Sequence, residues 1–171
     1  HFGFVAAWRL IGPFDNTGEK GYSNAYPPEQ KVQFADEYEG KHGIVRWTEH
    51  STTDDYGKVD LNAAIGKEKG GIAYAAAEFF SDAARPVELR LASVNANKIW
   101  LNGKLLHEAE VYHALSKIDQ YIGKGVVQPG RNLILLKLCQ NEQTEEWAQK
   151  WEFQLRVCNE TGTAIISTDR D

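Results

Sequence analysis

Residues 98–106, KIWLNGKLL, decide the fold. They form two short, mostly apolar runs separated by Asn102-Gly103. A type I′ turn requires positive φ at both of its central residues, which Asn tolerates and Gly adopts freely, so Asn-Gly between extended segments is a strong hairpin signal. We therefore predict a β-hairpin at this position, with Ile99 and Leu101 on one face of its first strand.

Short strands separated by turn residues account for most of the remaining chain. Residues 86–93 have the clearest alternation, in which Val87, Leu89 and Leu91 share one face. Gly12-Pro13 is expected to end the first strand, because proline has no N–H to donate to a ladder. A helical turn is expected within 108–119. The other predicted strands cover residues 4–11, 43–48, 72–80, 121–127, 133–139, 151–158 and, at one edge, 164–167.

This pattern predicts an all-β protein. About nine short strands, punctuated by Gly, Pro and Asn and lacking a long amphipathic helix, are typical of a sandwich or barrel. We expect a jelly-roll β-sandwich of two antiparallel sheets with long loops. At 171 residues the chain fits one domain.

Three segments resemble known β-sandwich domains. IWLNGKLL, residues 99–106, resembles the hairpin of galactose-binding-like domains, such as the sugar-binding jelly roll of family 2 glycoside hydrolases. VVQPGRNLILLKL, residues 126–138, resembles a later strand of the same domains. WRLIGPFDN, residues 8–16, looks like the first strand of ancillary domains in large bacterial secreted proteins. The resemblance implies a non-catalytic domain and a secreted, extracellular or periplasmic location.

Composition and chain ends narrow the possible functions. The net charge of −5 argues against nucleic-acid binding, which requires a basic surface. No apolar run reaches the roughly 18 residues of a membrane-spanning helix. The chain starts at His1 without a signal-peptide pattern, so we expect residues 1–171 to be a domain excised from a longer protein.

The two cysteines, Cys139 and Cys158, are expected on neighbouring strands of a late hairpin. In that hairpin Cys139 would lie near the turn and Cys158 at the far end. A disulfide requires Cα atoms within about 7 Å of each other. The sequence therefore predicts two unpaired, partly buried thiols.

Sequence motifs for catalysis are missing. The chain has no nucleophile elbow and no glycine-rich phosphate loop. His42, His50, His107 and His113 are scattered; a meeting of His107, His113 and Asp119 at one end of the sandwich is an alternative, although their spacing resembles no zinc signature. A glycosidase carboxylate pair needs a deep cleft that a small sandwich seldom offers. We expect no catalytic residue in this domain.

Loop aromatics are the candidate ligand-binding residues. Trp147 lies in a charged loop, Tyr22 and Tyr26 lie in the first long loop, and Tyr56 lies in the middle one. An exposed ring can stack on the apolar face of a pyranose while neighbouring polar groups bind the hydroxyls. The alternative for Trp147 is to fold back on Trp151 and cover the end of a hairpin. Trp8, Trp47 and Trp100 are expected in the core.

A calcium site is a further possibility at residues 15–19, DNTGE. Calcium takes six to eight oxygen ligands, and Asp15, Asn16 and Glu19 would supply some of them. The alternative is an Asx-turn made by the same residues. Galactose-binding-like domains often hold a structural calcium in such a loop, so the resemblance also implies this ion.

The hypothesis that we favour is a non-catalytic carbohydrate-binding module of a larger secreted protein, with carbohydrate as its ligand. The alternative is a structural domain that packs against a neighbouring domain of its parent and has no ligand of its own. A binding module requires exposed aromatics beside a polar groove, whereas a packing domain requires a broad apolar patch.

Overall fold

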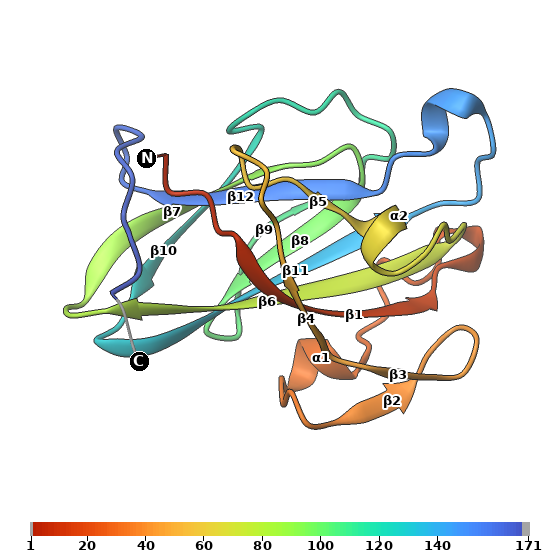
Figure 1. The fold of residues 1–171 in the computed structure, drawn as a ribbon, viewed down its shortest axis with the longest axis horizontal. Helices are drawn as coiled ribbons and strands as arrows, with labels where there is room; N and C mark the ends of the chain where they lie inside the picture. The colour runs from red at the N-terminus through yellow and green to blue at the C-terminus, as the bar shows by residue number, and fades with distance from the viewer. Residues whose placement is uncertain (1, 169–171) are drawn as a thin grey trace.

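A computed structural model describes residues 2–168 as two stacked antiparallel sheets with a small additional ribbon (Figure 1). The larger sheet has the strand order β4-β1-β6-β11-β8-β9. Its strands are β1 (Ala7–Asp15), β4 (Thr48–Ser51), β6 (Gly71–Ser81), β8 (Ala96–Leu101), β9 (Lys104–Ala109) and β11 (Gly130–Gln140). The prediction of an all-β sandwich of two antiparallel sheets is confirmed.

The smaller sheet has the order β10-β7-β12-β5. Its strands are β5 (Val59–Asp60), β7 (Arg85–Ala92), β10 (Tyr121–Val127) and β12 (Glu152–Cys158). The ribbon pairs β2 (Glu37–Glu39) with β3 (Ile44–Arg46). Helical structure in residues 2–168 is limited to single turns, namely η1 (Thr17–Glu19), α1 (Pro27–Gln30), α2 (Leu61–Ala64) and η2 (Glu146–Ala148). No helix in this range has the length and apolarity to cross a membrane.

The predicted Asn-Gly hairpin joins β8 and β9. Asn102 has φ of 50° and Gly103 has φ of 81°, so both central residues take the positive values that a type I′ turn needs. Leu101 pairs with Lys104 across the turn. This hairpin forms one edge of the larger sheet, with β8 bonded to β11 on its other side.

The main core lies between the two sheets. Strand β6 sits at the centre of the larger sheet, and its alternate residues Ala73, Ala75 and Ala77 point into this core. Tyr74 and Ala76 on its opposite face are buried in a second apolar cluster. A strand buried on both faces has no polar face, which explains why this segment shows no alternation of apolar and polar residues.

The second cluster is covered by the chain between β1 and β4. This covering segment, residues 17–47, contains η1, α1, β2 and β3 and lies on the outer face of the larger sheet (Figure 1). Tyr22 and Trp47 are its buried aromatic anchors. Trp8 and Trp100 are also buried, as predicted, together with Trp47.

Four local predictions are wrong. Residues 43–48 are not one strand, because β3 of the ribbon ends at Arg46 and β4 of the larger sheet begins at Thr48. Strand β1 continues through Pro13 to Asp15, because a register shift between Ile11 and Phe14 accommodates the proline. Residues 110–120 form bends and turns instead of a helical turn. Residues 164–167 contribute a single bridge between Ala164 and Cys158 instead of an edge strand.

The cysteines are unpaired, as predicted, but their expected arrangement is wrong. Cys139 lies in β11 of the larger sheet, whereas Cys158 is the last residue of β12 in the smaller sheet. The connection between these strands passes from one sheet to the other, so it is not a hairpin. Both thiols are buried, and burial raises the pKa of each.

Candidate functional site

Three loops meet at one end of the sandwich, and Asn16 joins them. This side chain is fully buried. Its Nδ2 donates to Gln140 O at 3.1 Å and to the Tyr112 hydroxyl at 3.0 Å, while its Oδ1 accepts from Gly21 N at 3.0 Å. The loops after β1, β9 and β11 are therefore held together, and we call the surface that they form the rim.

Asn141 organises the polar part of the rim. Its Oδ1 accepts a hydrogen bond from the backbone N–H of Gln143 at 3.2 Å, which fixes the orientation of the amide because a backbone N–H can only donate. The same oxygen lies 2.8 Å from His113 Nε2, so that ring nitrogen carries a proton. Asn141 Nδ2 donates to Glu19 Oε2 and Gln143 Oε1 at 3.1 and 2.9 Å.

Trp147 projects from the rim and is 64% exposed. Its ring contacts His113 edge-to-face, with the ring centroids 5.4 Å apart. The backbone of its turn, η2, is fixed because Ala148 is buried and its carbonyl accepts from Lys69 Nζ and Gln140 Nε2. Trp151 lies in the core, away from solvent. The structure thus leaves most of the Trp147 ring open to solvent on an anchored turn.

A shallow depression of about 410 Å³ lies beside this turn. Carboxyl and amide side chains line the depression. One of the lining residues, Glu145, precedes Trp147 by two positions in the chain. Glu142 Oε1 accepts from Gly18 N at 2.8 Å and closes one side. An aromatic ring next to hydrogen-bonding groups can bind a pyranose by stacking and by bonds to its hydroxyls. The lining residues are Gly18, Glu19, Asn141, Glu142, Gln143, Thr144 and Glu145.

The predicted tyrosines do not join this site as exposed rings. Tyr22 is only 5% exposed and its hydroxyl donates to Asn97 O at 3.1 Å, so it belongs to the core and cannot stack on a ligand. Tyr26 is half-buried against Phe14, and its hydroxyl donates to Asp15 O at 2.5 Å. Tyr56 is 50% exposed but lies against Phe2 and Phe4.

The residues proposed for calcium have other partners. Asp15 Oδ1 accepts from the amide and the hydroxyl of Thr17, an Asx-type turn that lowers the pKa of Asp15 chiefly through the hydroxyl bond. The oxygen of Asn16 is bonded to Gly21, and Glu19 accepts from Asn141. Within residues 2–168, no three His, Cys, Asp or Glu side chains are placed to hold a metal ion. These side chains do not fit a calcium site.

The suggested meeting of His107, His113 and Asp119 does not occur. His107 packs on Tyr121 with ring centroids 5.6 Å apart, and His113 bonds Asn141. Asp119 instead accepts bonds from Arg90 and Arg156. The scattered positions of the histidines in sequence correspond to separate places in the fold.

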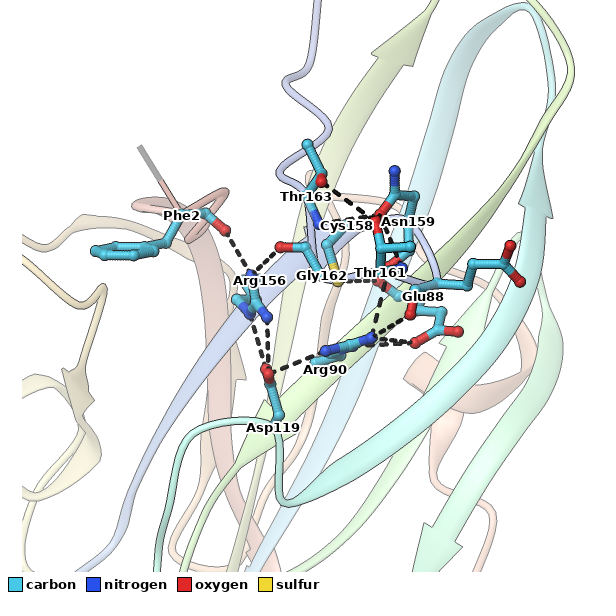
Figure 2. Close-up of polar contacts among 11 residues, drawn as sticks. Phe2, Glu88, Arg90, Asp119, Arg156, Cys158, Asn159, Thr161, Gly162 and Thr163 are labelled. Atoms are coloured by element: carbon cyan, nitrogen blue, oxygen red, sulfur yellow. Dashed lines mark hydrogen bonds and ion pairs between the residues drawn. The ribbon is translucent and has the colours of Figure 1, made fainter.

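Arg90, Arg156 and Asp119 form a cluster on the outer face of the smaller sheet that was not among the predicted sites (Figure 2). Arg90 of β7 and Arg156 of β12 are directly opposite each other in the ladder. Hydrogen bonds from Arg156, and then from Arg90, lower the pKa of Asp119, which has φ of 64°. In the sequence, each of these two strands carries an arginine on its polar face. The pairing of β7 with β12, which places the two arginines opposite each other, could not be predicted from the sequence.

Comparison with known proteins supports the fold. No protein-family model matches the sequence, and no curated protein is detectably similar to it. Among solved structures, a β-glucosidase from Kluyveromyces marxianus in complex with glucose has a TM-score of 0.51 and 12% identity, over 94% of this chain and 17% of that chain.

Two other solved structures are similar at lower scores. The PA14 domain of the antifreeze protein MpAFP has a TM-score of 0.46 and 10% identity, over 97% of this chain and 70% of that one. A β-glucuronidase from an uncultured Clostridium sp. has a TM-score of 0.48 and 11% identity, over 92% and 29% of the two chains. At these identities the likeness shows the fold alone. This chain is therefore a β-sandwich whose fold recurs as one part of a larger glycosidase chain.

Proposed function

We propose that this chain is a non-catalytic carbohydrate-binding module of a larger secreted protein and that it binds neutral sugars at the rim. The observation that carries the proposal is the exposed ring of Trp147 on an anchored turn beside a depression lined by amides and carboxyls. Stacking against Trp147 would hold a pyranose ring, and Glu19 and Gln143, which line the depression, would bind its hydroxyls.

The recurrence of the fold inside a β-glucosidase chain supports the ancillary role. This chain covers 17% of that enzyme, so the enzyme's activity is not transferred to it. The rim also lacks the features of a hydrolytic site. Its depression is shallow and open, whereas glycoside hydrolysis needs two carboxyl groups fixed across an enclosed sugar.

A screen of soluble oligosaccharides and insoluble polysaccharides tests the proposal. Wild-type protein is expected to bind at least one neutral glycan, and Trp147→Ala is expected to lose that binding. Tyr56→Ala is the matched control, because Tyr56 is a similarly exposed aromatic outside the rim. If the wild type binds no glycan, the alternative of a domain that packs against its parent replaces this proposal.

A further inference from the structure

A second cleft, of about 410 Å³, lies on the outer face of the smaller sheet. Its apolar lining residues are Phe2, Phe4, Tyr56 and Ile118. Phe2 and Tyr56 are stacked, with ring centroids 6.2 Å apart and planes inclined by 22°. Phe2 is 59% exposed, so this stacked pair is open to solvent.

The charged residues that line the cleft are Arg90, Arg156 and Asp119, and Figure 2 shows their polar contacts. Arg156 binds both oxygens of Asp119, from Nε and Nη2, each at 2.7 Å. Arg90 Nη1 binds Asp119 Oδ2 at 3.0 Å. Two like charges directly opposite on neighbouring strands repel each other, so this arrangement needs a bridging anion, which Asp119 supplies.

Each guanidinium retains one donor. Of its five N–H groups, Arg156 uses two on Asp119 and two on the carbonyls of Phe2 and Gly162. Arg90 uses two on Glu88, one on Asp119 and one, from Nη2, on the carbonyls of Glu160 and Asn159 at 3.2 and 3.5 Å. One N–H of Arg156 Nη2 and one N–H of Arg90 Nη1 have no acceptor among these hydrogen bonds. The two nitrogens are close together, because both also bond Asp119 Oδ2.

The charged groups that line this cleft differ from those of the rim. The charged residues lining the rim depression are all glutamates, whereas Arg90, Arg156 and Asp119 line the cleft. Glu88 lines a neighbouring groove and binds Arg90 at 2.7 Å, so two carboxylates balance the two guanidinium groups. An anion would therefore be held here by the unused N–H donors and not by a net positive charge.

We propose that this cleft binds a ring-shaped ligand that carries a carboxylate, and that a uronic acid sugar is its ligand class. The ring lies against Tyr56 and Phe2, and the carboxylate accepts the two remaining hydrogens from Arg156 and Arg90. An N–H of a charged guanidinium forms a strong hydrogen bond to a carboxylate oxygen, and here one such N–H comes from each of the two arginines. The proposal extends the carbohydrate-binding function to a second site with a different preference, but it does not require binding at the rim.

The test is an NMR titration of the whole chain with D-glucuronate, with D-glucuronamide and D-glucose as uncharged controls. We expect glucuronate to shift the side-chain Nε–H signals of Arg90 and Arg156 and the backbone amides of Thr161 and Gly162. The indole N–H of Trp147 is expected to remain unshifted. The uncharged controls are expected to shift these arginine signals several-fold less, and added salt to weaken the glucuronate response, since this site is partly open to solvent.

Two variants leave the arginine network in place. Tyr56→Ala is expected to weaken glucuronate binding about tenfold by removing the stacking surface. Thr161→Glu places a carboxylate at the edge of the cleft and is expected to weaken it about fivefold by repulsion. Ile44→Ala is the control, because Ile44 is an exposed side chain that lines neither site, and it is expected to bind as the wild type does.

Equal responses to glucuronate and glucuronamide, or no response of the arginine signals to glucuronate, would overturn the proposal. So would unchanged glucuronate binding by both Tyr56→Ala and Thr161→Glu. Failure of the rim to bind neutral glycans would leave these expectations intact, because the signals of the two sites are observed separately.

Discussion

Asn102 Nδ2 donates to Asn132 Oδ1 across 2.8 Å, and this bond joins the two segments that resemble galactose-binding-like domains. Asn102 lies in the turn between β8 and β9, and Asn132 lies near the start of β11. Asn102 Oδ1 also accepts from Leu133 N at 2.8 Å. Each segment therefore supplies a hydrogen-bond partner to the other, and these bonds hold the hairpin turn against the start of β11.

Replacement of Asn132 should be strongly destabilising. The side chain is fully buried, and its Nδ2 donates to the carbonyls of Phe79, Gln128 and Gly130. We expect Asn132→Ala to lower the free energy of unfolding by about 3 kcal/mol, because buried polar groups lose their partners. Urea unfolding followed by tryptophan fluorescence measures the change. A loss below about 1 kcal/mol would show that these bonds are replaced.

A buried lysine holds the covering segment on the larger sheet. Lys137 Nζ lies 2.6 Å from Glu29 Oε2 and donates to the carbonyls of Gly21, Tyr22 and Asn24 at 2.8–2.9 Å. Its side chain is completely buried, and burial lowers its pKa while the Glu29 carboxylate opposes that effect. The ammonium group with its three donors thus ties a long loop to strand β11.

We expect Lys137→Met to lower the free energy of unfolding by about 3–5 kcal/mol, because it leaves Glu29 without its positive partner in a buried site. The double variant Lys137→Met with Glu29→Gln should recover part of this loss, since the unpaired charge is gone. Denaturant unfolding of the two single variants and the double variant forms the required cycle. Additive effects in that cycle would contradict a direct coupling between these two side chains.

Asp119 should make stability depend on acid pH. Hydrogen bonds from Arg156 and Arg90 hold its pKa below the usual value. Its stabilisation is therefore present above the unfolded pKa of about 3.9 and is lost as pH falls through the lower folded value. We expect Asp119→Asn to be about 2 kcal/mol less stable than the wild type at pH 7, where a charged acceptor is replaced by a neutral one.

The same variant supplies the pH control. The difference in unfolding free energy between Asp119→Asn and wild type should shrink as pH falls below about 4, because the wild-type carboxyl becomes protonated. Unfolding midpoints measured in urea across the acid range would show this convergence. A constant difference at every pH would mean that Asp119 acts by packing, not by charge.

The sequence predicted those parts of the fold that depend on local signals. Positive φ at Asn102-Gly103 and the alternation of residues 86–93 both depend on neighbouring residues, and the structure confirms a turn and a strand there. The arrangement of Cys139 and Cys158 was not predictable in this way. It depends on which sheet each strand joins, and nearness in sequence wrongly suggested a hairpin.

The candidate sites show the same division. The charged loop made Trp147 the best candidate for an exposed ring, with folding back on Trp151 as the alternative, and in the structure this ring is 64% exposed and contacts His113. Burial of Tyr22 did not follow, because its loop folds back over the outer face of the larger sheet. Lys137 likewise alternates with apolar residues as an exposed side chain would, and only the covering segment buries it.

Calorimetric titration with the neutral glycan that binds best in the screen is the most direct test of carbohydrate binding at the rim. The account predicts measurable binding heat for the wild type and for Tyr56→Ala, and at least about a tenfold loss of affinity for Trp147→Ala. Equal affinity of Trp147→Ala and the wild type, or no binding by the wild type, would contradict it.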